Sequence, residues 1–291
     1  QAHGGEGQWA FGTGFDDPLA GVDTAVPDGV DASDLGAYCL MLGDDALVLS
    51  QRLTEWVTRA PELEEEVALA NCALDLLGQA RLLLARAGTC GVLGRSRSAA
   101  TGSIPDEDAL AYFRESEEFV NHHLVEVDGG DFAATMVRLL AASAYRLALF
   151  ARLRDSRDPV LAAIAAKGVP ELTYHRDYAA RWVLRLGDGT TESHRRTVEA
   201  VDALWPLLAD LPAATAVEAR LAAAGIAVDP CVVDGEVRDV LSTVLEQATL
   251  EVPPWPTPRP SPGRAGSHTP GFDELLATLQ GLAREHPAAT W

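Results

Sequence analysis

Residues 42–81 read LGDDALVLSQRLTEWVTRAPELEEEVALANCALDLLGQAR and carry the strongest helical pattern of the chain. In its first half, apolar residues recur at alternating steps of four and three, which is the spacing of one helix face. That face comprises Leu42, Ala46, Leu49, Leu53 and Trp56. Leu40, Leu47 and Val48 make the rest of the circumference apolar too. We therefore predict a helix over 34–59 that is buried in the middle of a bundle.

The second half of the same stretch predicts another helix. Pro61 stands where a first-turn proline belongs, and the acidic residues after it favour a helix N-terminus. This helix is expected to run from Pro61 to Ala87. Only Arg59 and Ala60 separate the two helices, so they should pack as antiparallel neighbours, each roughly 40 Å long at about 1.5 Å per residue.

The rest of the chain carries further helical patterns and no credible strand pair. Helices are predicted over 106–125, 132–154, 159–186, 192–209, 214–250 and 272–285, with an irregular connection over 253–270. The helix over 159–186 should break or kink near Gly168 and Pro170, because a proline inside a helix removes a hydrogen bond. The fold class expected is all-α, with a four-helix bundle core and additional flanking helices.

The first 33 residues show no such pattern. They are rich in Gly, Asp and Pro, with scattered aromatics at Trp9, Phe11 and Phe15. Because no apolar period is sustained, we predict that 1–33 is a disordered or loosely attached acidic arm. A single helical domain should follow over 34–291.

Charge and composition restrict the partners and the compartment. The formal net charge of -20 repels phosphate backbones and anionic lipid, so neither nucleic acid nor a membrane surface is an expected partner. No run of 18 apolar residues lacks charges, and no basic segment followed by an apolar core marks the N-terminus. The cysteines form no CxxC pair. We therefore expect a cytoplasmic protein.

Polar residues inside the apolar helices are the candidates for a functional site, because burying such groups unpaired costs about 1–3 kcal/mol each. They are Asp44 in the first helix, Asn71, Asp75 and Gln79 in the second, and Glu171 and His175 in the helix over 159–186. Carboxylates that face inward from several antiparallel helices are the ligands of a di-metal site.

The sequence nevertheless lacks the full ligand set of such a site. A di-iron bundle needs one carboxylate from each of two helices and a Glu-x-x-His pair from each of the other two. The position three after Asp75 is Gly78, and the position three after Glu171 is Tyr174. The helix over 132–154 contains no Asp or Glu. We therefore predict no metal, no cofactor and no catalytic residue in this chain, with vestigial site positions at Asp44, Asp75, Glu171 and His175.

The remaining polar residues and motifs of the sequence are interpreted as structural features. The four vestigial positions would otherwise form a buried polar network that fixes the register of the bundle, and Lys167 is placed to pair with Glu171 one turn later. His122 and His123 are expected to be a surface pair. The loop GRAGSHT over 263–269 is a weak signal for a segment that covers a pocket or a partner. No phosphate-binding loop, dinucleotide fingerprint, nucleophile elbow or HExxH motif is present.

Three runs and the C-terminal region carry a family resemblance. The runs are residues 42–81, RLRDSRDPVLAAIAAKGVPELTYHRDY over 152–178, and GIAVDP over 225–230, followed by the closing loop and helix that end in Trp291. Over 35–291 the chain resembles the C subunits of bacterial phenylacetyl-CoA epoxidase, a ferritin-like family. The acidic arm lies outside this resemblance.

The resemblance implies a place in a multicomponent monooxygenase. In that family the A subunit holds the di-iron site, a reductase subunit delivers electrons from NADPH, and the C subunit is a related bundle without the metal centre. The complex adds one oxygen atom of O2 across the aromatic ring of phenylacetyl-CoA and gives the ring 1,2-epoxide. This chain would then be a non-catalytic structural subunit that partners the A subunit in a hetero-oligomer.

Two other functions are alternatives to the role of a structural subunit. A stand-alone di-iron oxidase with an unconventional ligand set of Asp75, Glu171 and His175 would require stoichiometric iron and turnover by the chain alone. An acyl-CoA-binding helical module would require direct binding of phenylacetyl-CoA by the isolated chain, through a local Arg patch that holds the CoA phosphates.

Overall fold

The computed structural model describes residues 19–93 and 104–287 of the 291-residue chain. Regular structure in these two ranges is helical throughout, which confirms the predicted all-α, ferritin-like class. The α-helices are α1 Ala32–Thr54, α2 Leu63–Thr89, α3 Asp106–Tyr112, α4 His123–Glu126, α5 Phe132–Leu153, α6 Pro159–Gly187, α7 Thr191–Leu204, α8 Ala216–Ala223, α9 Asp234–Gln247 and α10 Phe272–Glu285. Short 3-10 turns lie at Ser116–Glu118, Trp205–Asp210, Pro230–Val233 and Gly263–Ala265.

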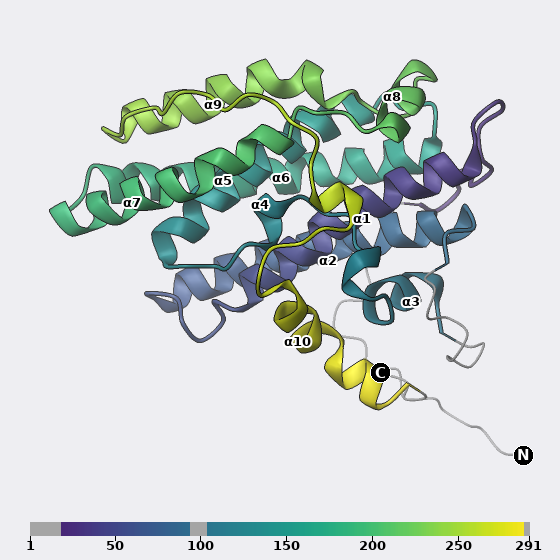
Figure 1. Ribbon diagram of the computed structural model, residues 1–291, viewed down its shortest axis with the longest axis horizontal. Helices are drawn as coiled ribbons and strands as arrows, with labels where there is room; N and C mark the ends of the chain where they lie inside the picture. The colour runs from purple at the N-terminus through teal and green to yellow at the C-terminus, as the bar shows by residue number, and fades with distance from the viewer. Residues whose placement is uncertain (1–18, 94–103, 288–291) are drawn as a thin grey trace, which may run out of the picture.

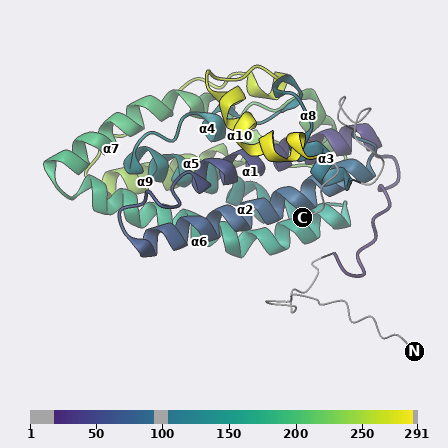
Figure 2. The same ribbon diagram turned by 90° about the horizontal axis from the view of Figure 1, so that it is seen from below.

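Four long helices make the bundle core. The helices α1 and α2 pack as one antiparallel pair, α5 and α6 as another, and α2 lies beside α6 (Figure 1). In Figure 2, α2 and α6 run along the lower edge of the molecule, and the C-terminal segment with α10 lies toward the upper edge. Every residue of α1 from Met41 to Ser50 is buried, as its apolar circumference predicts.

The helix α6 is continuous, so a break near Gly168 and Pro170 is wrong, whereas the alternative, a kink there, stays a prediction. Pro170 is exposed to solvent. Gly168 is explained by packing, because a Cβ atom there would lie 2.7 Å from Cδ2 of Phe150 on α5. The glycine therefore allows close approach of α5 and α6 and does not interrupt the helix.

Two predicted helices are divided in the structure. The segment over 106–125 becomes α3, a 3-10 turn and α4, because Arg114 turns inward after α3 and is buried. The segment over 214–250 becomes α8, a 3-10 turn and α9. Gly225 has a positive φ of 72° after α8, a conformation that ends the helix and favours glycine. The terminal helix α10 has the bounds predicted for it.

The predicted arm lies partly outside the described residues, which begin at 19. Residues 19–31 instead pack against the bundle: the carbonyl oxygens of Thr24 and Ala25 accept hydrogen bonds from Arg86 on α2, and Val22, Val26 and Val30 contact the core. Asp31 then caps α1 by accepting a hydrogen bond from the backbone N–H of Ser33.

Candidate functional site

The interior of the bundle brings three of the four predicted site positions to the boundary between α2 and α6. Nε2 of His175 lies 3.0 Å from Oδ2 of Asp75. The His175 side chain is fully buried, whereas the Asp75 side chain is 35% exposed. Glu171, one turn before His175, accepts a hydrogen bond of 2.9 Å from the side-chain amide of Gln79. The Asp75 and Glu171 carboxylates therefore have separate partners.

Lys167 binds the Glu171 carboxylate oxygen that does not bind Gln79. Lys167 forms an ion pair with Glu171 across one turn of α6, as the i, i+4 spacing predicts. The Glu171 side chain is 17% exposed, so this pair is only partly screened by water. The charge of the carboxylate is thereby neutralised by an ammonium group of the same helix.

A buried arginine completes the network from α5. Nε of Arg146 donates to Oε1 of Gln79 at 2.9 Å, and Nη1 donates to the carbonyl oxygen of Leu42 at 2.9 Å. The guanidinium lies over the Phe150 ring, 4.4 Å from its centroid. Burial lowers the pKa of Arg146 to about 10, although the nearby Asp45 carboxylate acts in the opposite direction. Arg146 therefore places a positive charge inside the bundle.

Sequence reasoning missed Arg146. The signal was available, because an arginine within the apolar run LAASAYRLALF must either face solvent or be satisfied in the core. The periodicity of α5 alone does not distinguish these outcomes. The residues that satisfy Arg146 come from α1 and α2, so only the packed bundle identifies the guanidinium as part of the interior network.

Asp44 does not join the other predicted positions, and this grouping has to be corrected. Its carboxylate is fully buried and accepts two hydrogen bonds from the Arg114 guanidinium, one of them 3.0 Å long, and one of 2.9 Å from the backbone N–H of Val120. Asp44 thus holds the segment between α3 and α4 against α1. Helical spacing places Asp44 next to the apolar stripe of α1. Spacing does not specify whether a side chain at that place faces another helix of the bundle or a segment that covers it.

The neighbouring carboxylate, Asp45, anchors a second buried cluster. Arg264 of the 263–269 loop donates to Asp45 at 2.7 Å, and Nδ1 of His122 lies 3.2 Å from the same oxygen. Burial alone would raise the pKa of the Asp45 carboxyl, but the positive charge of Arg264 and the contacts with His122 hold this pKa well below its ordinary value. His122 is buried, so its predicted position on the surface is wrong.

The same loop is held at its other end by Glu126 of α4. The Glu126 carboxylate accepts hydrogen bonds from the backbone N–H of Thr269 at 2.6 Å and from Asn121 at 2.7 Å, and it contacts Nδ1 of His268 at 2.7 Å. Burial opposes ionisation, but these partners lower the pKa of Glu126 below its ordinary value. The 263–269 loop therefore covers the segment that joins α3 to α4, and the chain itself provides the surface that it covers.

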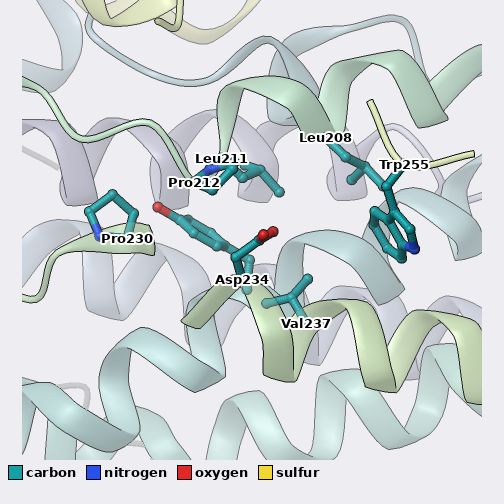
Figure 3. Close-up of a pocket in the computed structure, with 8 residues that line it drawn as sticks. Leu208, Leu211, Pro212, Pro230, Asp234, Val237 and Trp255 are labelled. Atoms are coloured by element: carbon teal, nitrogen blue, oxygen red, sulfur yellow. The ribbon is translucent and has the colours of Figure 1, made fainter. Parts of the chain in front are cut away.

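Small cavities lie beside these clusters. One cavity of about 20 Å³ is bounded by residues of α1, α5 and the α4 region, including Asp45, His122, Tyr145 and Arg146. Another of about 10 Å³ lies between the 3-10 turn after α7 and the start of α9. Figure 3 shows Pro230 at one end of this second cavity and Leu208 with Trp255 at the other. Each has room for about one water molecule, so neither accommodates a ligand the size of an acyl group.

A metal pair does not fit the residues that the structure places in the bundle. Within 19–93 and 104–287, no group of three His, Cys, Asp or Glu side chains is arranged to hold a metal ion. The two predicted carboxylates at the boundary of α2 and α6, Asp75 and Glu171, are already bound to His175, Gln79 and Lys167. What the arrangement does is neutralise buried charge and fix α2, α5 and α6 relative to one another.

Comparison with known proteins agrees with this architecture. Residues 23–291 match the family described as phenylacetic acid catabolic protein. The chain is 42% identical over 257 residues to the C subunit of 1,2-phenylacetyl-CoA epoxidase from Escherichia coli (strain K12), an alignment that covers 88% of this chain and 99% of that protein. The family match begins at residue 23, within the segment that packs against the bundle.

Proposed function

Because the chain belongs to the family of phenylacetic acid catabolic proteins, we propose that it is a structural, non-catalytic subunit of a complex that epoxidises the aromatic ring of phenylacetyl-CoA. Similarity to one subunit of that epoxidase, over nearly the whole length of both proteins, supports membership of the complex. The observation that carries the non-catalytic role is that the chain's own cations serve this network: the partly exposed Lys167 pairs with Glu171, and the buried Arg146 binds Gln79.

The charge balance of the interior supports this role. A di-iron centre needs several carboxylates that are free to bind the metal, and its positive charge stabilises them together. In this chain Lys167 supplies the positive charge at Glu171, and Arg146 adds a further one through Gln79. In this proposal the bundle keeps the shape of an oxygen-activating subunit, while the Glu171 and Asp75 carboxylates bind side chains of the same chain.

The remaining chemistry belongs to other subunits in this proposal. Oxygen activation takes place at a di-iron centre in the catalytic A subunit, and a reductase subunit supplies electrons from NADPH. The present chain stabilises that assembly. We also propose that it works in the cytoplasm, because Cys39, Cys72 and Cys90 are buried as free thiols and Cys231 is an exposed one.

The decisive experiment measures iron and activity separately. The isolated chain is loaded anaerobically with ferrous iron, desalted and analysed for iron per chain; the expected value is near zero. The complex is then assembled with the Glu171→Gln variant, and phenylacetyl-CoA turnover per assembled complex should stay within about twofold of the unmodified complex. Near two irons per chain, with oxygen-dependent turnover by the isolated chain, would overturn the proposal.

A further inference from the structure

One long face of α2 is apolar and faces solvent. Leu63, Val67, Leu74 and Leu77 are 71%, 53%, 64% and 39% exposed. Together with Ala70 they follow the spacing 63, 67, 70, 74, 77, which alternates steps of four and three. This is the seam of a coiled coil, which is complementary to a second helix carrying the same spacing. We call these five residues the α2 seam.

The α2 seam is unusual for a helix of this composition. Both α2 and α5 are apolar and long enough to span a membrane by those criteria alone. The most apolar window of α5 is 89% buried, as expected of a core helix, but that of α2 is only 44% buried. From Leu63 to Leu77 the exposed seam extends about 21 Å at about 1.5 Å per residue. An apolar stripe of this length marks an interaction site.

Gly78, one turn after Leu74, is a second and independent indication. Glycine is the poorest helix former after proline, so its place in the middle of α2 requires a reason. At Gly43 and Gly88 the reason lies within the chain, because an added Cβ would meet Leu84 at 2.9 Å and Asp106 at 2.4 Å. At Gly78, as at Gly235 on α9 and Gly281 on α10, an added Cβ would meet no atom within 4 Å, and Gly78 lies beside the exposed seam. The space beside Gly78 therefore suits close approach of a helix from outside the chain.

Charge decides which occupant fits. The N-terminal end of the seam carries exposed Glu62 and Glu64, and the whole chain has a formal net charge of -20. Two copies of so acidic a chain repel each other at long range. A different subunit with basic residues near Glu62 and Glu64 would instead be attracted. Arg81, beyond the other end of the seam, already pairs with Glu107 at 3.6 Å.

We infer that the α2 seam, with Gly78 beside it, is the surface on which this chain docks a long amphipathic helix of a second subunit of the epoxidase complex. That helix presents apolar side chains at alternating steps of three and four and packs closest at Gly78. Its basic residues lie toward Glu62 and Glu64. This inference rests on the proposed function, because it assigns the partner from the complex to which the chain is proposed to belong.

The test uses the full chain co-expressed with the other subunits of the complex. The variants are Leu74→Glu, which places a charge in the middle of the seam, and Gly78→Leu, which fills the approach beside it. Leu282→Glu is the matched control, because Leu282 is 57% exposed on α10, outside the seam. Complex formation is measured by sedimentation velocity and binding titration, and urea unfolding of each isolated variant checks its fold.

The expected result is a loss of affinity for the partner of at least about tenfold for both seam variants and less than about twofold for Leu282→Glu. Gly78→Leu is the sharper variant, because leucine favours the helix and should leave the isolated chain at least as stable. If all three variants assemble with unchanged affinity, the α2 seam is not the docking surface, while the proposed function stays intact. If the unmodified chain does not assemble with the other subunits, the proposed function itself fails. Loss of self-association without loss of the hetero-complex would identify a second copy as the occupant and overturn the inference.

Discussion

Nε2 of His175 lies 3.0 Å from Oδ2 of Asp75, and the buried imidazole thereby takes its partner from a carboxylate at the edge of solvent. This contact joins α6 to α2 at the place where a di-iron bundle would have metal ligands. The contact links two helices of the bundle, and its contribution to stability can be measured.

Removing the carboxylate should destabilise the fold. Asp75→Ala leaves the buried imidazole of His175 without its partner, so the free energy of unfolding should fall by about 1–3 kcal/mol. Urea unfolding followed by circular dichroism measures the change. Asp177→Ala is the control, because Asp177 pairs with the adjacent Arg176 in a half-exposed setting, and it should change stability by less than about 0.5 kcal/mol. Equal effects of the two variants would contradict the structural role of Asp75.

Arg146 and Gln79 should behave as a coupled pair. Each single change, Arg146→Met or Gln79→Leu, leaves one buried polar atom, Oε1 of Gln79 or Nε of Arg146, without its partner and should cost about 2–4 kcal/mol. The double variant should cost less than the sum of the single changes by about 1 kcal/mol or more, because both polar groups are then removed together. A double-mutant cycle from urea unfolding gives this coupling. Strict additivity would mean that the hydrogen bond between them contributes nothing.

The 263–269 loop should make the fold sensitive to acid. The folded-state pKa of Glu126 lies below its ordinary value of 4.5, so its ionised form contributes stability that is fully present above about pH 4.5 and is lost as pH falls through the folded pKa. Unfolding free energies measured from about pH 3 to about pH 7 should therefore fall on the acid side. Glu126→Gln should flatten this dependence and lower stability at about pH 7 by about 1–3 kcal/mol.

A matched variant separates this local effect from general acid denaturation. Glu236→Gln changes an exposed partner of Arg152 and should leave both the stability at neutral pH and the shape of the acid limb unchanged. If Glu126→Gln retains the full acid dependence of the unmodified chain, the anchoring of the loop through Glu126 does not control it.

Pro170 should be a source of instability within a continuous helix. Pro170→Ala restores a backbone N–H inside α6 and removes a ring that crowds the preceding turn, so the free energy of unfolding should rise by about 1–3 kcal/mol. Pro159→Ala is the control at the first position of the same helix, where proline costs little, and it should be neutral or slightly destabilising. A destabilised Pro170→Ala variant would show that the bundle requires the local geometry of proline.

The long helices could be predicted from sequence for a clear reason. The stretch 42–81 combines a helical apolar period with an acidic first turn, and both α1 and α2 form near their predicted bounds. The predicted first-turn position of Pro61 is wrong, because Pro61 precedes the N-cap residue Glu62 and residues 55–62 separate the two helices. The shorter elements were harder, because Arg114 and Gly225 end helices through contacts and backbone conformations that periodicity does not encode.

In the candidate site, too, some contacts follow from spacing along one helix and others depend on distant segments. Lys167 and Glu171 are neighbours on one helix turn, so their pairing follows from spacing alone. By contrast, Asp44 and Asp45 are adjacent in sequence but bind Arg114 and Arg264, which lie 70 and 219 residues further along the chain. No local pattern specifies such partners.

The linear sequence was therefore enough to predict the all-α bundle and the family to which the chain belongs. These depend on residue types and on spacing along one helix, which the linear chain fixes directly. Three features become visible in the packed molecule alone: Asp44 faces a covering segment, Arg146 lies inside the bundle and one face of α2 remains exposed. Those outcomes depend on which side chains from distant segments meet, and the free energy of burying a charge is set by the partner that it finds there.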